Sequence, residues 1–238
     1  MSGATLDLRG QRAVPPQTWR RTELRRLVVA DMELTALPEE FGALRQLHTL
    51  DAAHNRLTEV PDALGRLRAL EILYLGDNAL TAVPDGVRAL RALRYLGLDG
   101  NAIAALPDWI GELDGLVELR VQGNALVSLP ATIDGLAALR ELHTRGNRLA
   151  ALPASLGALS ELRVLDLRDN ALTALPETIG LLRALRVLDL RANPLTALPD
   201  ALADLPALEK LDLRWTPFFP ALPPVARALA QRGCVVLH

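Results

Sequence analysis

The feature that most constrains this chain is a repeat with a period of 23 residues. The stretch LRVLDLRDNALTALP, which begins at Leu162, returns as LRVLDLRANPLTALP from Leu185. One step of the frame beyond the outermost asparagines reaches Met32 and Thr216, which gives nine units. The asparagines that mark the period are residues 55, 78, 101, 124, 147, 170 and 193. A fixed period of this length predicts a solenoid of stacked units, because one unit cannot bury its own apolar face.

Each unit follows the pattern LxxLxLxxNxLxxLPxxIGxLxx and divides into two parts. Alternating apolar residues in LxLxx are typical of a strand with one buried face. After the proline the apolar residues fall three apart, as in Ile179, Leu182 and Leu185, which indicates a short helical or 3₁₀ turn. The pattern predicts an α/β solenoid, with a parallel sheet on its concave side and short helical or 3₁₀ returns on its convex side.

The recurring polar and small residues have physical roles in this pattern. An asparagine side chain has two donors and an acceptor, so after the strand it can satisfy backbone groups that the turn leaves unpaired. The proline fixes φ where the return begins. A glycine follows four residues later in most units, but Arg88 and Asp134 occupy that position elsewhere, so we expect right-handed backbone there. Ala52 and Thr144 replace a core leucine, and both predict looser packing; the Thr144 hydroxyl needs a partner.

Composition excludes several classes of protein. Of the 238 residues 50% are hydrophobic and 23% charged, the balance of a folded chain, while aromatics are only 3%, so the core must be aliphatic. The net charge of −2 argues against a general binder of nucleic acid. Lys210 is the only lysine, and this arginine bias favours a GC-rich, bacterial source.

Cysteine usage and the N-terminus predict a location. Cys234 is the single cysteine, which excludes an internal disulfide and favours a reducing compartment; we expect it to be a small buried residue. The N-terminal residues contain no apolar signal segment, and no apolar run is long enough to span a membrane. We expect a cytoplasmic protein, and secretion by a signal-less route stays open.

The repeat resembles a known family. Eight or nine copies of LxxLxLxxNxLxxLPxxIGxL, over residues 24 to about 223, are similar to the 23-residue leucine-rich repeat class. That class includes the Ras-group plant intracellular proteins, Scribble-type scaffolds and bacterial leucine-rich repeat proteins. The resemblance implies a curved solenoid that binds proteins, and it carries no partner identity.

The two ends depart from the frame and predict caps. Residues 1–23 form an N-terminal cap with a degenerate repeat, residues 24–223 the nine units, and residues 224–238 a C-terminal cap, all within one domain. The C-terminal cap is expected to be a helix ended at Gly233 and then an edge strand. We expect Trp19, Phe218 and Phe219 to cover the open ends of the leucine core.

Function is expected in the variable positions. Counting the first leucine of a unit as position one, positions three, five and seven face outward together on the sheet. The middle units contain both tyrosines beside Gly76 and Gly97, and glycine in a strand indicates that something approaches the backbone closely. We predict a partner-binding patch there, with drift on a solvated surface as the alternative. Its residues are Ile72, Tyr74, Tyr95, Asp99, Glu118, Arg120, Gln122, His143 and Arg145.

The last units present two columns of charge. Asp166, Asp189 and Asp212 occupy position five, and arginines 168, 191 and 214 occupy position seven. Each column is screened by its opposite neighbour. We interpret them as a neutral, solvated ladder copied by repeat duplication, and a docking site is the alternative.

Motifs for chemistry are missing from the sequence. There is no HExxH, CxxC or GxxxxGK[ST], so we predict no metal site, no cofactor and no catalytic residue. His143 with Glu141 faces outward on an open sheet and is expected to be a plain surface histidine. The chain is predicted to be a monomer that binds an unidentified protein or peptide, and neither nucleic acid nor membrane. The alternatives are a substrate-recognition partner of an enzyme such as a ubiquitin ligase, and a self-associating structural protein.

Overall fold

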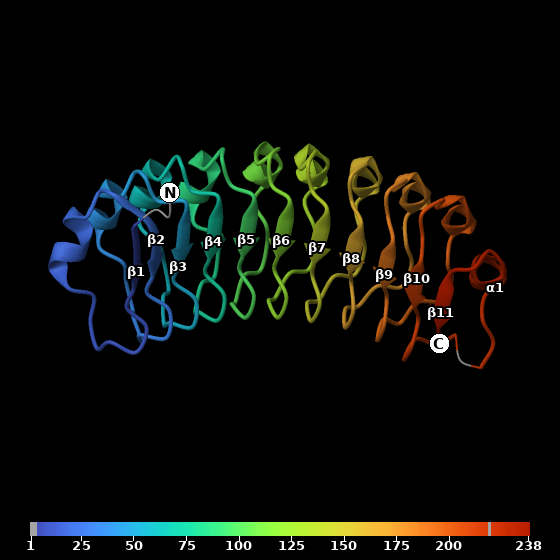
Figure 1. Cartoon of the computed structure of the whole chain (residues 1–238). Helices are drawn as coiled ribbons and strands as arrows, with labels where there is room; N and C mark the ends of the chain where they lie inside the picture. The colour runs from blue at the N-terminus through green and yellow to red at the C-terminus, as the bar shows by residue number, and fades with distance from the viewer. Residues whose placement is uncertain (1–3, 219) are drawn as a thin grey trace.

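A computed structural model describes residues 4–218 and 220–238. Its strands form one parallel sheet of 11 strands whose spatial order is the order of the chain (Figure 1). The strands are β1 (Ala4–Asp7), β2 (Leu24–Val28), β3 (Thr49–Asp51), β4 (Ile72–Tyr74), β5 (Tyr95–Gly97), β6 (Glu118–Arg120), β7 (Glu141–His143), β8 (Val164–Asp166), β9 (Val187–Asp189), β10 (Lys210–Asp212) and β11 (Val235–Leu237). The solenoid predicted from the period is confirmed.

Short 3₁₀ helices return the chain from one strand to the next, and they line the side opposite to the loops in Figure 1. They are η1 (Pro16–Arg20), η2 (Glu39–Ala43), η3 (Asp62–Arg66), η4 (Asp85–Ala89), η5 (Asp108–Glu112), η6 (Ala131–Gly135), η7 (Ala154–Ala158), η8 (Glu177–Leu181) and η9 (Asp200–Asp204). The repeated proline is the residue just before each of η2 to η9, with φ between −59° and −78°. Proline therefore sets the entry into the return without giving up a hydrogen bond inside it.

The register of the sheet follows the period of the sequence. Leu50 pairs with Leu73, and Leu73 with Leu96, so residues 23 apart lie side by side on neighbouring strands. The leucines at these positions are almost fully buried, and they form a continuous apolar core between the sheet and the 3₁₀ helices. Burial of a leucine contributes roughly 2 kcal/mol, and here every unit contributes to the same core.

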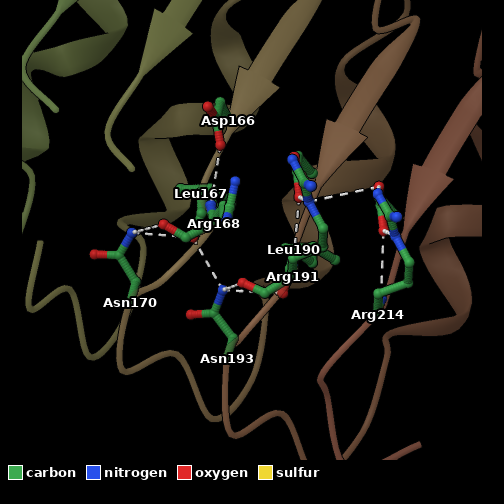
Figure 2. A network of polar contacts seen from close by, with 10 residues as sticks. Asp166, Leu167, Arg168, Asn170, Leu190, Arg191, Asn193 and Arg214 are labelled. Atoms are coloured by element: carbon green, nitrogen blue, oxygen red, sulfur yellow. Dashed lines mark hydrogen bonds and ion pairs between the residues drawn. The ribbon is translucent and has the colours of Figure 1, made fainter. Parts of the chain in front are cut away.

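The repeated asparagines bond to backbone groups after each strand, as predicted, and they also link neighbouring units, which the pattern did not show (Figure 2). Asn170 Nδ2 donates to the carbonyl oxygens of Leu167 at 2.9 Å and Thr144 at 3.1 Å. Its Oδ1 accepts from the backbone N–H of Leu149 at 3.0 Å. One side chain thus satisfies backbone groups of two units, which fixes the distance between them. At the frame position of the last unit, the Thr216 hydroxyl donates only to the Leu213 carbonyl, at 2.5 Å.

Thr144 in the core has the hydrogen-bond partner that its burial requires. Its side chain is fully buried, and its hydroxyl donates to the backbone carbonyl of Asp166 at 3.1 Å. The glycines four residues after the prolines lie outside the left-handed region, as predicted. They have a second role that the pattern did not show. A Cβ at Gly111 would lie 2.1 Å from the backbone oxygen of Thr132, so the close approach of η5 and η6 needs glycine there.

One residue in each of the nine units, the residue before the asparagine position, has left-handed backbone. Three of these are glycines, 100, 123 and 146. The other six are Asp31, His54, Asp77, Asp169, Ala192 and Trp215, with φ between 51° and 62°. The chain turns sharply here as it leaves the strand, a requirement that the repeat pattern does not show.

The ends of the stack carry caps. Trp19 and Phe218 pack partly buried against the core, whereas Phe219 lies outside the described residues. The helix α1 (Pro224–Gln231) is followed by Gly233, with φ of 96°, and by β11, which pairs with β10. Cys234 is buried, as expected. Within residues 4–218 and 220–238, no helix is long and apolar enough to cross a membrane.

Candidate functional site

The predicted patch residues are adjacent on the outer face of the sheet. At position three, Ile72, Tyr95 and Glu118 are register partners along β4 to β6. At position five, Tyr74 pairs with Gly97, and Arg120 pairs with His143. These side chains are half-buried, because each is flanked by its neighbours in the adjacent units. Asp99, Gln122 and Arg145 follow the ends of β5 to β7, and of these Arg145 is exposed.

The two tyrosines form an aromatic pair that explains one of the strand glycines. The rings of Tyr74 and Tyr95 have centroids 4.7 Å apart and are tilted by 48°. A Cβ at Gly97 would lie 3.0 Å from Tyr95 Cε1. Gly97 therefore makes room for the Tyr95 ring of the same chain, so the close approach that we predicted at this glycine is made by that ring and not by a partner. Burial is the main cause that raises the pKa of Tyr95 to about 12, so its hydroxyl stays a neutral donor.

A cluster of charges lies beside the tyrosines. Arg120 Nε donates to Glu118 Oε1 at 2.5 Å, and His143 Nε2 lies 3.0 Å from Glu141 Oε2. The His143 side chain is only 14% exposed, so it is not the plain surface histidine that the sequence predicted. Burial raises the pKa of Asp99, although its Oδ1 accepts from the backbone N–H of Gln122 at 3.0 Å.

Three potential metal ligands meet in this cluster. Side-chain atoms of Glu118, Glu141 and His143 lie within 4.8 Å of one another. The carboxylate of Glu118 is already paired with Arg120, and that of Glu141 with His143. These internal pairs compete with any cation for the same oxygens, and the absence of a metal site stays a prediction.

The surface is hollowed near the patch and again on the opposite side. A depression of about 400 Å³ is lined by Asp99, Gln122, Arg145, Asp169 and the left-handed glycines 100, 123 and 146. A larger hollow of about 630 Å³ lies among η4 to η6, away from the predicted patch. Its Glu112 carboxylate is held by Arg88 at 2.6 Å and Arg91 at 2.8 Å. The open hollow with its paired charges shows no convergent reactive groups, so we place the candidate site on the sheet.

In two of the last three units, the aspartate and the arginine of the charge columns form an ion pair (Figure 2). Arg191 forms a bidentate pair with Asp189, and Arg214 donates to both oxygens of Asp212 at 2.9 and 2.8 Å. Arg191 also reaches Asp212 at 3.5 Å. Burial raises the pKa of Asp212, but the hydrogen bonds from Arg214 together with the charges of Arg191 and Arg214 outweigh it, and the net pKa is lowered.

The unit with Asp166 and Arg168 has no such ion pair. Asp166 Oδ1 accepts from the backbone N–H of Arg168 at 3.1 Å, and the Arg168 guanidinium forms no ion pair among the described residues. Burial is the main cause that raises the pKa of Asp166. The screening predicted for the ladder therefore holds for Asp189 and Asp212 and fails at Asp166.

Trp215 is a surface residue that sequence reasoning missed. The residue is 66% exposed, and its φ is 62°. The guanidinium carbons of Arg168, Arg191 and Arg214 lie 5.5, 5.9 and 5.6 Å from the centroid of its ring. The sequence did contain a signal for this residue. At the same position of the repeat, the other units have glycine, alanine, aspartate or histidine, and tryptophan is the exception.

The fold and its repeated frame define a leucine-rich repeat protein. The family model described as "Leucine rich repeat" matches residues 22–80, 45–103 and 153–218, which together exceed half of the chain. The chain therefore belongs to the leucine-rich repeat family. A comparison with curated proteins found no match.

Solved structures with this fold include a bacterial protein and two plant receptors. A leucine-rich repeat protein of Leptospira interrogans has a TM-score of 0.80 and 27% identity, covering 91% of this chain and 61% of that one. The plant peptide hormone receptor RGFR1, in complex with RGF2, has a TM-score of 0.77 and 25% identity, covering 89% and 36%. The ectodomain of the Arabidopsis thaliana receptor kinase GASSHO1/SCHENGEN3, in complex with CASPARIAN STRIP INTEGRITY FACTOR 2, has a TM-score of 0.79 and 27% identity, covering 98% and 32%. The chain thus spans less than two thirds of the length of each.

Proposed function

We propose that this chain is a binding module that holds a partner protein or peptide on the outer face of its sheet, and that it catalyses no reaction itself. The observation that carries the proposal is the tyrosine pair, whose centroids lie 4.7 Å apart amid outward-facing polar residues. Tyrosine and arginine are enriched in the centres of protein interfaces, because they combine a large apolar area with a polar group.

Two further observations support a binding role. The two plant neighbours are described in complex with RGF2 and CASPARIAN STRIP INTEGRITY FACTOR 2, bound to proteins of the same fold. The single cysteine is buried and burial raises its pKa, so it is not an activated nucleophile. A reducing compartment stays our proposal for its location, because Cys234 has no cysteine to pair with in this chain.

The test compares partner capture by variants in the native cell's lysate. The Tyr74→Ala, Tyr95→Ala variant should bind a captured partner at least ten-fold more weakly, because it removes both aromatic anchors. Its urea unfolding should show that it still folds. The Trp215→Ala variant is the matched control, with an exposed aromatic in another part of the sheet, and it should keep a partner that binds the tyrosines.

Equal affinity of the tyrosine variant and the unmodified chain would overturn the tyrosine site. Light scattering addresses the self-associating alternative, because a chain that pairs through its outer sheet face would have twice the monomer mass without any partner. A dimer whose formation is abolished by the tyrosine substitutions would replace the proposed partner with a second copy.

A further inference from the structure

A second feature of the outer face lies at the C-terminal end of the stack. Four consecutive units have arginine at position seven, and the left-handed residue after the last one is tryptophan. We name this surface the arginine–tryptophan patch and define it by Arg145, Arg168, Arg191, Arg214 and Trp215. It shares only Arg145 with the predicted tyrosine patch.

In the last two units of this patch, the charge that a partner would meet is positive, although the formal charges balance there. The Asp212 side chain is 1% exposed and that of Asp189 is 14% exposed, because both lie at the level of the strands. The arginines that pair with them extend further, with 21% of the Arg191 and 41% of the Arg214 side chain exposed. The carboxylates of Asp189 and Asp212 are therefore more covered than the guanidinium groups that pair with them, whereas Asp169, next to Arg168, is exposed.

Two of the four arginines have no carboxylate partner within the described part of the chain. Among residues 4–218 and 220–238, neither Arg145 nor Arg168 lies within ion-pair distance of a carboxylate. They lie in adjacent units, where Gly146 N–H donates to the Arg168 carbonyl at 3.0 Å. Their backbones are thus one strand spacing apart, so one extended chain can present carboxylates to both arginines.

Trp215 provides an apolar surface next to these free charges. Its left-handed backbone is shared with the same position of every other unit, but the other units have a smaller side chain there. Three guanidinium groups lie against the ring, yet 66% of the residue remains exposed. A large aromatic surface left in water beside cations has the composition of an interface hot spot.

We infer that the arginine–tryptophan patch docks an extended acidic peptide segment of a partner protein. Carboxylates of the segment pair with Arg145 and Arg168, and an apolar side chain lies on Trp215. The units of Arg145 and Trp215 are three strand spacings apart, about 14 Å. An extended peptide crosses that distance in roughly five residues. A peptide can place uncharged residues opposite Asp166 and the exposed Asp169. A nucleic acid fits less well, because it carries a phosphate at every nucleotide and would meet these carboxylates.

The experiment titrates ¹⁵N-labelled protein with a capped peptide of glutamates around a central phenylalanine. The readout is the indole N–H signal of Trp215, assigned through Trp215→Phe, with the signals of Trp19 and Trp109 as internal references. The glutamate peptide should shift the Trp215 signal saturably at low salt and bind at least ten-fold more weakly at high salt, because salt screens exposed pairs. The same peptide with glutamine should bind at least ten-fold more weakly than the glutamate peptide.

Three variants locate the effect. Arg145→Gln, Arg168→Gln should weaken binding at least ten-fold, and it breaks no ion pair within the described residues. Arg163→Gln, an exposed arginine at position two of the same unit as Arg168, should leave binding unchanged. Tyr74→Ala, Tyr95→Ala should also leave it unchanged, which separates this inference from the proposed function.

Several results would overturn the inference. They are an unmoved Trp215 signal, equal binding of the glutamine peptide, and full binding by the double arginine variant. Stronger binding of a lysine peptide would assign the surface to the aspartate column instead. Stronger binding of a duplex oligonucleotide would assign it to phosphate, and a shift that depends only on protein concentration would assign it to a second copy of the chain.

Discussion

At the scale of single residues, the left-handed residue of each unit imposes a requirement that the sequence meets only in part. Three of the nine positions are glycine, which adopts positive φ without strain. The rest carry side chains, and Ala192 and Trp215 have no amide or carboxylate that could compensate locally. Each left-handed residue other than glycine therefore lowers the stability of the stack at its own position.

Replacing Ala192 with glycine should stabilise the protein. Left-handed backbone costs an alanine about 1–2 kcal/mol, and the greater entropy of an unfolded glycine offsets part of the gain. We expect the free energy of unfolding to rise by about 0.5–1 kcal/mol in urea titrations. The control Ala171→Gly, an exposed residue outside the left-handed region, should lower it. A loss of stability in both variants would refute the assignment of strain to Ala192.

Asp166 should make the stability depend on pH in the direction opposite to Asp212. Because burial raises the folded pKa of Asp166, its ionised form destabilises the fold above that pKa, and this penalty disappears as the pH falls through it. Asp212, with a lowered pKa, stabilises the fold above its unfolded value and loses this effect in acid.

Asp166→Asn keeps the acceptor for Arg168 N–H and removes the charge. We expect it to raise the free energy of unfolding by about 0.5 kcal/mol at pH 7, a typical size for such a site. The difference should vanish below about pH 4, where the reference carboxylate is protonated. Unfolding measured across this range checks the prediction, and a variant that is less stable at pH 7 contradicts it.

At the scale of elements, the spacing of the 3₁₀ helices depends on glycines at their contacts. A Cβ at Gly111 would lie 2.1 Å from the Thr132 oxygen, which is backbone and cannot rotate away. The same substitution at Gly115, in the same unit, would meet nothing closer than 3.7 Å. The two glycines have different roles that the sequence pattern alone does not separate.

Gly111→Ala should therefore destabilise the protein, because η5 and η6 must separate to admit the methyl group. Overpacking of this kind costs about 1–3 kcal/mol. Gly115→Ala should change the free energy of unfolding by less than about 0.5 kcal/mol. Urea unfolding of the pair provides the comparison, and equal effects would show that the contact adjusts without strain.

The elements also show what the sequence could predict and where it stopped. The 23-residue period predicted the parallel sheet and its register, because Leu50, Leu73 and Leu96 can share one core only if each unit repeats the same path. The sequence could not show that the Tyr95 ring occupies the space over Gly97, since that depends on a side-chain rotamer. Nor could it show that Trp215 contacts Arg168 across an intervening unit. The period describes only the features that all units share, and no other unit has a tryptophan at this position.

At the scale of the whole molecule, contacts between elements join neighbours along the stack. Within the described part of the chain, each strand contacts the strands before and after it, each 3₁₀ helix does the same, and α1 contacts η9 and β11. Such a molecule behaves as a line of coupled units, in which stability is the sum of unit and interface terms.

A weak unit in the middle should therefore divide the stack. Leu142, fully buried in β7, is near the centre, and Leu142→Ala should cost about 2–5 kcal/mol. We expect the urea transition to broaden or split, because each half then unfolds on its own. Leu27→Ala in β2, close to the end of the stack, should broaden it less. Parallel shifts of both transitions with unchanged slope would show that the whole molecule unfolds as one unit.

The register of the sheet also bears on how such a surface can change over generations. Because residues 23 apart are side by side, gain or loss of one whole unit moves every later column by one strand spacing, about 4.8 Å, and leaves its facing unchanged. A gain or loss of one residue within a strand instead moves each later side chain of that strand to the opposite face of the sheet. Unequal recombination between near-identical units, such as those beginning at Leu162 and Leu185, can therefore lengthen or shorten the distance between two binding residues in a single genetic event.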